Sequence, residues 1–214
     1  MKYWLVKNKN QQDKMSEIKF FGKWDAEGIE VKDPGLKRYI NLQPFTIPRT
    51  RGKHSQQQFG KSKMSIVERL VTKLMVPGHK GKKHVLTSGR LGGRFLTNAK
   101  IVKRTFEKIE ELTKKNPIEV LVRAIENAAL REETASYQVG GIIVRRAVVT
   151  SPQRRVDIAL RNITQAAYRK AYGKKMDIVS ALADEIIAAY NNDASKSEAI
   201  REKERIEREA EASR

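Results

Sequence analysis

Residues 131–155 read REETASYQVGGIIVRRAVVTSPQRR, and this stretch decides the fold. Two runs rich in Val, Ile, Thr and Tyr, 134–139 and 142–150, flank Gly140-Gly141. Paired glycines supply the positive φ angles that a tight hairpin turn requires, so the stretch predicts a two-stranded β-ribbon. Because a lone hairpin is only marginally stable in water, we expect the ribbon to lean on a helical body.

The predicted ribbon is basic as well as β-prone. It carries Arg145, Arg146, Arg154 and Arg155, and the stretch from 136 to 156 contains no acidic residue. Arginine presents a planar fork of donors that matches phosphate oxygens. The local pattern alone leaves two interpretations open: an arm that contacts nucleic acid, or an ordinary solvated hairpin.

Composition favours the first interpretation. The 214 residues carry a net charge of +19, with a pI of about 10.1. Residues 51–104 hold fourteen Lys and Arg against a single Glu68, so this quarter of the chain contributes +13. Such a clustered excess predicts a polyanionic partner.

Several classes of protein are disfavoured by what the sequence lacks. There is no cysteine, which excludes a disulfide framework, cysteine zinc sites and a thiol nucleophile. The first residues lack the apolar core of a signal peptide, and no apolar run approaches the roughly 18 residues of a membrane span. We therefore expect a cytoplasmic protein.

The chain divides into three parts. Residues 1–63 are expected to form an N-terminal extension, which ends in a basic arm (IPRTRGKHSQQQFGKSK, 47–63) that becomes ordered on a partner. Residues 64–194 are expected to form a helical RNA-binding domain that includes the β-ribbon at 131–150. Residues 195–214 are expected to form a polar C-terminal helix with few apolar positions, which frays.

The fold class predicted is mostly α: a single helical domain of about six helices, with the two-stranded β-ribbon protruding between the third and fourth. The helices are expected from 65, over 97–115, from 117, over 153–172, over 177–191, and from 195. Ser65-x-x-Glu68 and Ser195-x-x-Glu198 have the spacing of capping boxes, and Asn116-Pro117 that of a cap followed by a first-turn proline. The basic, glycine-rich stretch 79–95 is expected to be an exposed loop.

The sequence shows no catalytic, metal or cofactor site. His54, His79 and His84 lie in basic loops, where neighbouring lysines repel a cation. The glycines of GHKGKK and GRLGGR lack the spacing of a nucleotide-binding loop. No Ser/His/Asp arrangement stands out, so we expect neither an enzyme nor a cofactor.

Four segments resemble, in order, ribosomal protein seven of the small subunit. They are SIVERLVTKLM, NPIEVLVRAIENAALREETASYQVGG, VTSPQRRVDIALRNITQAAYR and IVSALADEIIAAYNND, and IKFFGKWD near the start is similar to the archaeal and eukaryotic branch. The resemblance implies a helical fold with a protruding β-ribbon. It also implies a structural protein that binds the head (3′ major) domain of small-subunit ribosomal RNA and nucleates head assembly, with head proteins as neighbours and the ribbon near exit-site tRNA or mRNA.

Residue by residue, the resemblance and the charge pattern together give a set of expected RNA contacts. The family's arginine pair after the second strand falls on Arg154 and Arg155, and its basic segment before the first helix falls on residues 49–63. The loop 79–95 is longer than the family pattern, so only its charge argues for contacts there. The complete expected set is Arg49, Arg51, Lys53, Lys61, Lys63, Lys80, Lys82, Lys83, Arg90, Arg94, Arg145, Arg146, Arg154, Arg155, Lys174 and Lys175.

Two rival functions differ in class from a ribosomal protein. A helical domain with a basic wing resembles a winged-helix regulator that binds DNA by sequence, but here charge is spread over arm, loop, ribbon and turn instead of one recognition helix. That distribution suits a folded RNA recognised by shape and phosphates. An RNA-modifying enzyme is the other rival, which the absence of catalytic residues disfavours.

Overall fold

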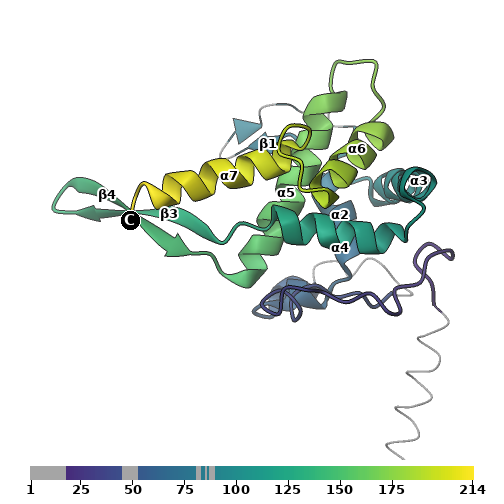
Figure 1. Ribbon diagram of the computed structural model, residues 1–214, viewed down its shortest axis with the longest axis horizontal. Coiled ribbons are helices and arrows are strands. Elements are labelled where there is room, and N and C mark those ends of the chain that lie inside the picture. Colours follow the sequence, from purple (N-terminus) through teal and green to yellow (C-terminus); the bar gives the residue numbers. More distant parts are fainter. Residues whose placement is uncertain (1–17, 45–52, 81–82, 85, 87–89) are drawn as a thin grey trace, which may run out of the picture.

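The structure is a computed structural model that describes residues 18–44, 53–80, 83–84, 86 and 90–214. Its helices are α2 (Ile66–Leu74), α3 (Phe95–Thr113), α4 (Pro117–Ala128), α5 (Pro152–Ala171), α6 (Ile178–Tyr190) and α7 (Glu198–Glu211). Strands β3 (Glu132–Val139) and β4 (Ile142–Val149) form an antiparallel ribbon between α4 and α5 (Figure 1). The predicted fold class is confirmed, and the ribbon lies between the third and fourth of these helices.

The helices pack around one apolar core. Most of its largest fully buried side chains come from α2, α3, α4 and α5, and include Leu70, Phe106, Leu121 and Ile163. Helix α6 lies against α3, α4 and α5 and is therefore central to the bundle. The apolar periodicity of these segments accounts for the packing, because residues three and four apart share one helix face.

The N-terminal segment from residue 18 shares this core. Phe20, Trp24, Leu36 and Ile40 are buried, and the Trp24 ring meets Phe106 of α3 edge to face at 5.6 Å between centroids. In Figure 1 the segment runs beneath α4. The basic arm continues into two 3-10 helices, η1 (Lys53–Gln56) and η2 (Gly60–Lys63), which the sequence did not predict. A Cβ at Gly60 would lie 1.9 Å from the His54 carbonyl oxygen, so only glycine, which has no Cβ, fits at this position.

The first turn of α2 differs from the predicted capping box. Ser65 is the N-cap residue, but its side chain makes no capping hydrogen bond and its buried Oγ has no partner among the described residues. Glu68 is only 7% exposed and borders a cavity of about 400 Å³, together with Phe20, Val71 and Phe95. Burial raises the pKa of the Glu68 carboxyl to about 7. The carboxyl therefore faces an apolar cavity instead of the helix end.

The last helix, α7, braces the ribbon. The Ala147 N–H of β4 donates to the Ser213 carbonyl, and the Arg214 guanidinium binds both carboxylate oxygens of Glu132 at 2.8 and 2.7 Å. The Arg131 N–H donates to Glu207 on the same helix. Figure 1 shows α7 running from the bundle to the base of the ribbon. The sequence predicted a polar helix that frays, and it did not predict these bonds between the end of the helix and the strands.

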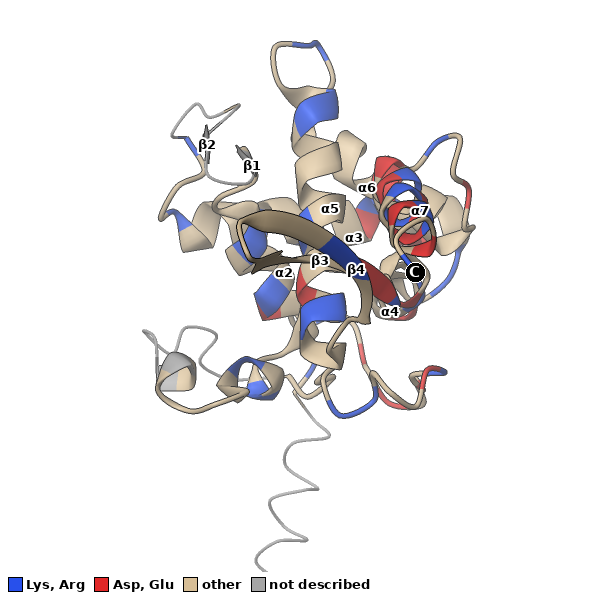
Figure 2. Ribbon diagram, turned by 90° about the vertical axis from the view of Figure 1, so that its left-hand side faces the viewer, with Lys and Arg blue, Asp and Glu red and all other residues tan. Residues whose placement is uncertain are grey.

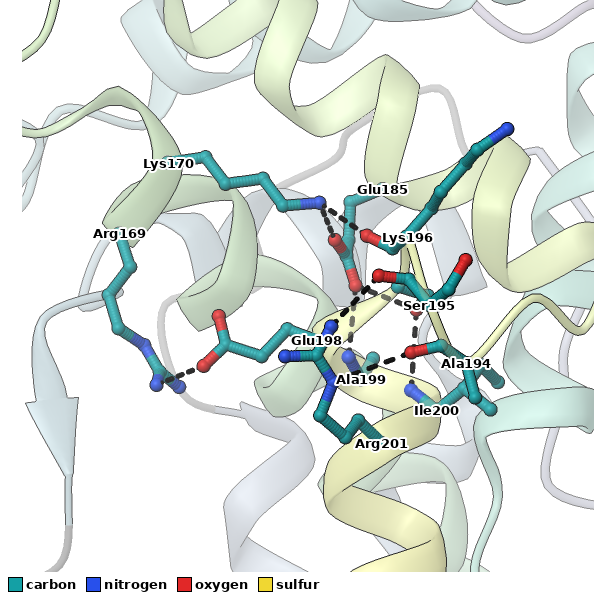
Figure 3. Close-up of polar contacts among 11 residues, drawn as sticks. Arg169, Lys170, Glu185, Ala194, Ser195, Lys196, Glu198, Ala199, Ile200 and Arg201 are labelled. Atoms are coloured by element: carbon teal, nitrogen blue, oxygen red, sulfur yellow. Dashed lines mark hydrogen bonds and ion pairs between the residues drawn. The ribbon is translucent and has the colours of Figure 1, made fainter.

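The beginning of α7 is fixed by a buried carboxylate on α6 (Figure 3). Glu185 is fully buried and accepts from the Ser197 hydroxyl at 2.8 Å, from the Ala199 N–H at 2.9 Å and from the Lys170 ammonium. The N-cap residue is Ser197, whose Oγ accepts from the Ile200 N–H. The predicted cap at Ser195 is wrong, since that hydroxyl donates to Asp193.

The remaining boundaries follow the sequence closely. Asn116 caps α4 as predicted, its side chain accepting from the Ile118 N–H at 3.1 Å. The stretch 79–95, expected to be a loop, contains two two-residue strands, β1 (His79–Lys80) and β2 (Lys83–His84), in antiparallel register.

Candidate nucleic-acid interface

The ribbon turns through its paired glycines. Gly140 and Gly141 have φ angles of 54° and 87°, as the hairpin prediction required, and Val139 pairs with Ile142 across the turn. Arg145 lies opposite Ser136 and Arg146 opposite Ala135 in the register. Successive side chains of a strand point to opposite faces, so the exposed side chains of Arg145 and Arg146 lie on opposite faces of the ribbon. They can therefore bind two different phosphates but cannot clamp a single one.

The tip of the ribbon is apolar, which sequence reasoning missed. One face near the turn is formed by two cross-strand pairs, Val139 with Ile142 and Tyr137 with Val144, and all four side chains are 44–70% exposed. A directly opposite pair shares a face, so the strand register was the signal that could have revealed this patch. The ribbon thus has an apolar tip and arginines further back.

At the base of the ribbon, two predicted RNA contacts have partners within the protein. Arg154 binds Glu133 of β3 with both ends of its guanidinium, at 2.6 and 2.7 Å, while half of its side chain stays exposed. Arg155 donates to Asp33 at 2.8 Å and to the Leu130 carbonyl at 3.1 Å, and its side chain is 13% exposed. Both arginines therefore hold the junction between ribbon and bundle.

These contacts shift the ionisation of the groups involved. Partial burial raises the pKa of Asp33, but hydrogen bonds from Arg155 and the Gly35 N–H outweigh it and hold the pKa below its usual value. The hydrogen bond to Glu133 raises the pKa of Arg154. Both shifts favour the charged forms of Asp33 and Arg154.

The other expected contacts are spread over separate elements. Lys61 and Lys63 of η2, Arg94 at the start of α3, and Lys174 and Lys175 after α5 are exposed. Arg90 is also exposed. Arg49, Arg51 and Lys82 lie outside the described residues, as do the side chains of Lys53, Lys80 and Lys83. Within the described part, the predicted residues do not converge on one point but surround the bundle on several sides.

A second basic group, between α2 and α5, joins the predicted Lys61 to Arg69, Lys73 and Arg161, which were not predicted as contacts. The Asp157 carboxylate lies 3.2 Å from Arg69 Nη2, 3.7 Å from Lys73 Nζ and 3.9 Å from Lys61 Nζ. Arg161, one turn further along α5, lines the same groove. The spacing of four between Arg69 and Lys73, which places both on one face of α2, was the available signal.

Figure 2 shows how the charges divide. Lysines and arginines lie on α2, α5 and the loop after α5, whereas many of the Asp and Glu residues seen in this view lie on α7. Helix α5 carries five basic residues and one acidic residue, a net +4. Helix α7 carries six glutamates and four basic residues, a net −2, and makes several internal ion pairs. The positive face is therefore the one opposite α7.

The described residues contain no group of three His, Cys, Asp or Glu side chains that could hold a metal ion. In that same part of the chain, no helix combines the length and the apolar character needed to cross a membrane.

The fold and the charged surface define a class: a basic helical protein with a projecting ribbon, built to meet a polyanion on several sides. The comparisons with known proteins identify the family within that class. Residues 36–214 match the model of the ribosomal protein S7p/S5e family. The chain belongs to this family.

Archaeal relatives cover nearly the whole chain. The chain is 50% identical to small ribosomal subunit protein uS7 of Nanoarchaeum equitans, over 92% of this chain and all of the relative. It is 48% identical to the uS7 protein of Archaeoglobus fulgidus, over 92% of this chain and 96% of the relative. The uS7 protein of Methanococcus maripaludis is 45% identical, over 92% of this chain and all of the relative. The family expected from the sequence is confirmed, and these archaeal relatives agree with the archaeal and eukaryotic type that was expected. A member of this family is a structural ribosomal protein, not an enzyme.

Proposed function

We propose that this chain, a structural constituent of the small ribosomal subunit in the cytoplasmic ribosome, binds the head (3′ major) domain of the ribosomal RNA and nucleates head assembly. The observation that carries the proposal is the placement of exposed basic side chains on η2, the start of α3, the ribbon and the loop after α5. A folded RNA can surround a protein and present phosphates to several of its sides at once. Duplex DNA presents its phosphates along a single regular double helix. Its partners are this RNA and neighbouring proteins of the head.

The ribbon has a separate role in this proposal. Arg145 and Arg146 are available for phosphates on either face, and the apolar tip beyond them extends away from the core. A tip that does not stabilise the bundle is free to meet a mobile partner. We assign this partner as exit-site tRNA or the mRNA beside it.

Footprinting tests the proposal. Isolated head-domain RNA and duplex DNA of equal length are compared at matched salt. Saturable protection of discrete RNA segments, with weak and uniform DNA protection, is the expected result. Equal protection of DNA would favour a DNA-binding regulator and overturn the proposal.

A pair of ribbon variants tests the role of the tip. Deleting residues 139–144 should leave folding and head assembly intact but weaken retention of exit-site tRNA. Arg145→Ala with Arg146→Ala should weaken RNA binding instead, without changing helix content. A tip deletion that blocks assembly while the double arginine variant assembles normally would reverse the assignment.

A further inference from the structure

A groove of about 510 Å³ lies between α2 and α5, and Lys61 is the one residue of its described lining that the sequence predicted as an RNA contact. Each helix presents two charged residues spaced four apart, Arg69 and Lys73 on α2 and Asp157 and Arg161 on α5. Residues at this spacing share one helix face, so the two pairs face each other across the groove. Lys61 of η2 adds a fifth charged side chain at its edge.

The groove holds more positive charge than its single carboxylate can neutralise. Asp157 is its only acidic residue among the described lining residues, against four cations, which leaves a surplus of +3. Arg69 is committed to the fold: its side chain is 4% exposed, and it binds both Asp157 and the Tyr39 carbonyl. The lysines are partly exposed, at 55% for Lys61 and 34% for Lys73, and Arg161 is exposed. Three cations are therefore available to an incoming anion.

The electrostatics of Lys73 reflect this crowding. Burial lowers the pKa of Lys73, Asp157 opposes the lowering, and Lys61, Arg161 and Arg69 add to it. A second anion in the groove would relieve the repulsion among these cations. Asp157, at 3.7 and 3.9 Å from the two lysines, holds them loosely enough to be outcompeted.

We propose that this groove binds one backbone phosphate of RNA, with Lys61, Lys73 and Arg161 as donors and Asp157 holding the two lysines in place while no phosphate is bound. The inference rests on the proposed RNA-binding function and names a site within it. A phosphodiester fits because Lys61 belongs to η2, where exposed Lys63 continues the same basic segment. An RNA strand that follows η2 brings its phosphates past the groove.

Loss of one donor should weaken binding in a defined way. Lys73→Gln and Arg161→Gln should each lower the affinity for head-domain RNA about tenfold, the value of one hydrogen bond to a charged group. Each should also reduce the log–log salt slope by roughly 0.7–0.9, the value for one phosphate contact. The matched control is Lys103→Gln, which removes an exposed lysine of α3 and should change neither quantity.

Phosphate-ethylation interference locates the contact. With the unmodified protein, ethylation of each contacted phosphate blocks binding. The groove predicts one phosphate whose ethylation no longer matters in Lys73→Gln, and the same phosphate in Arg161→Gln. An unchanged pattern in either variant, or different phosphates in the two, would overturn the inference. Failure of the unmodified protein to bind head-domain RNA would overturn the proposed function itself, so the two failures are distinguishable.

The Asp157→Asn variant should change the affinity for RNA in the opposite direction from Lys73→Gln and Arg161→Gln. Removing the competing carboxylate should raise the affinity for RNA several-fold, measured where circular dichroism shows the variant to be folded. A merely structural Asp157 would leave the affinity unchanged or lower it, and either result would overturn its role in the groove. If Asp157→Asn does not fold, the ethylation comparison decides.

Discussion

The buried carboxyl of Glu68 makes the stability of this protein depend on pH. Its pKa is raised to about 7 in the folded state, whereas an unfolded chain has the ordinary value near 4.5. Below pH 4.5 the carboxyl is protonated in both states and costs nothing. Between pH 4.5 and 7 the unfolded chain ionises this carboxyl while the folded protein keeps it protonated beside the apolar cavity, so stability falls across this range and levels off above pH 7.

The magnitude follows from the shift. One pKa unit corresponds to about 1.4 kcal/mol, which gives at most about 3.5 kcal/mol for the change from 4.5 to 7. The adjoining cavity admits some solvent screening of the charge, so we expect roughly 1–3 kcal/mol. Glu68→Gln removes the ionisation while keeping the size of the side chain. The variant should gain this amount relative to the unmodified protein between pH 5 and pH 8.

Urea denaturation at several pH values measures the difference. The control is Glu30→Gln, which removes an exposed carboxyl and should follow the unmodified protein at every pH. A constant difference between Glu68→Gln and the unmodified protein from pH 5 to pH 8 would refute the reasoning. Such a result would mean that Glu68 ionises in the folded state as easily as in the unfolded chain.

Three further outcomes are expected. RNA affinity should fall steeply with salt, each phosphate contact adding roughly 0.7–0.9 to the log–log slope, and a flat dependence in filter binding would contradict the multi-sided interface. Arg155→Ala should destabilise the protein by about 1–3 kcal/mol because it leaves the Asp33 carboxylate unpaired, whereas Arg154→Ala should cost under about 1 kcal/mol; equal losses in urea would count against this assignment. Glu185→Ala should cost about 3 kcal/mol and speed hydrogen exchange at the Ala147 amide, because α7 loses its first-turn acceptor; unchanged exchange would show that α7 does not brace the ribbon.

The local features of the fold could be read from the sequence. Gly140-Gly141 between β-branched runs specified the ribbon, and apolar periodicity specified each of α2 to α6. These signals need no knowledge of distant residues. Asn116 was predicted correctly as a cap for the same reason, since its acceptor role involves only the N–H two residues later.

Features that depend on distant partners could not be read. Ser65-x-x-Glu68 has capping-box spacing, but the cavity formed with residues 18–22 and Phe95 takes the carboxyl away from the helix end. The start of α7 is chosen by Glu185 on another helix, not by Ser195. The Ser65 and Ser195 segments both have capping-box spacing in the sequence. The groups that prevent the predicted caps come from distant parts of the chain, so the local pattern does not reveal them.

The same limit applies to the interface. Charge counting identified the basic segments, and the contact residues predicted in them are exposed wherever the structure describes their side chains outside the ribbon base. Sequence gave no sign that Arg155 would meet Asp33, which lies 122 positions earlier. Nor did it bring Lys61, Arg69 and Lys73 around Asp157. Charge in the sequence indicates which residues can bind an anion. Only the fold shows which of them already pair with a carboxylate of the protein itself.

The two-stranded ribbon also has a consequence for copies of the protein that are not assembled. Both of its strands are edge strands, and the backbone bond from Ala147 to Ser213 covers one edge only near the base. Towards the tip, Val139, Ile142 and Ile143 are 64–70% exposed beside backbone donors and acceptors that another strand could pair with. Such an edge is a template for strand addition between molecules. Rapid incorporation, or a chaperone that shields the tip, would keep surplus copies from aggregating.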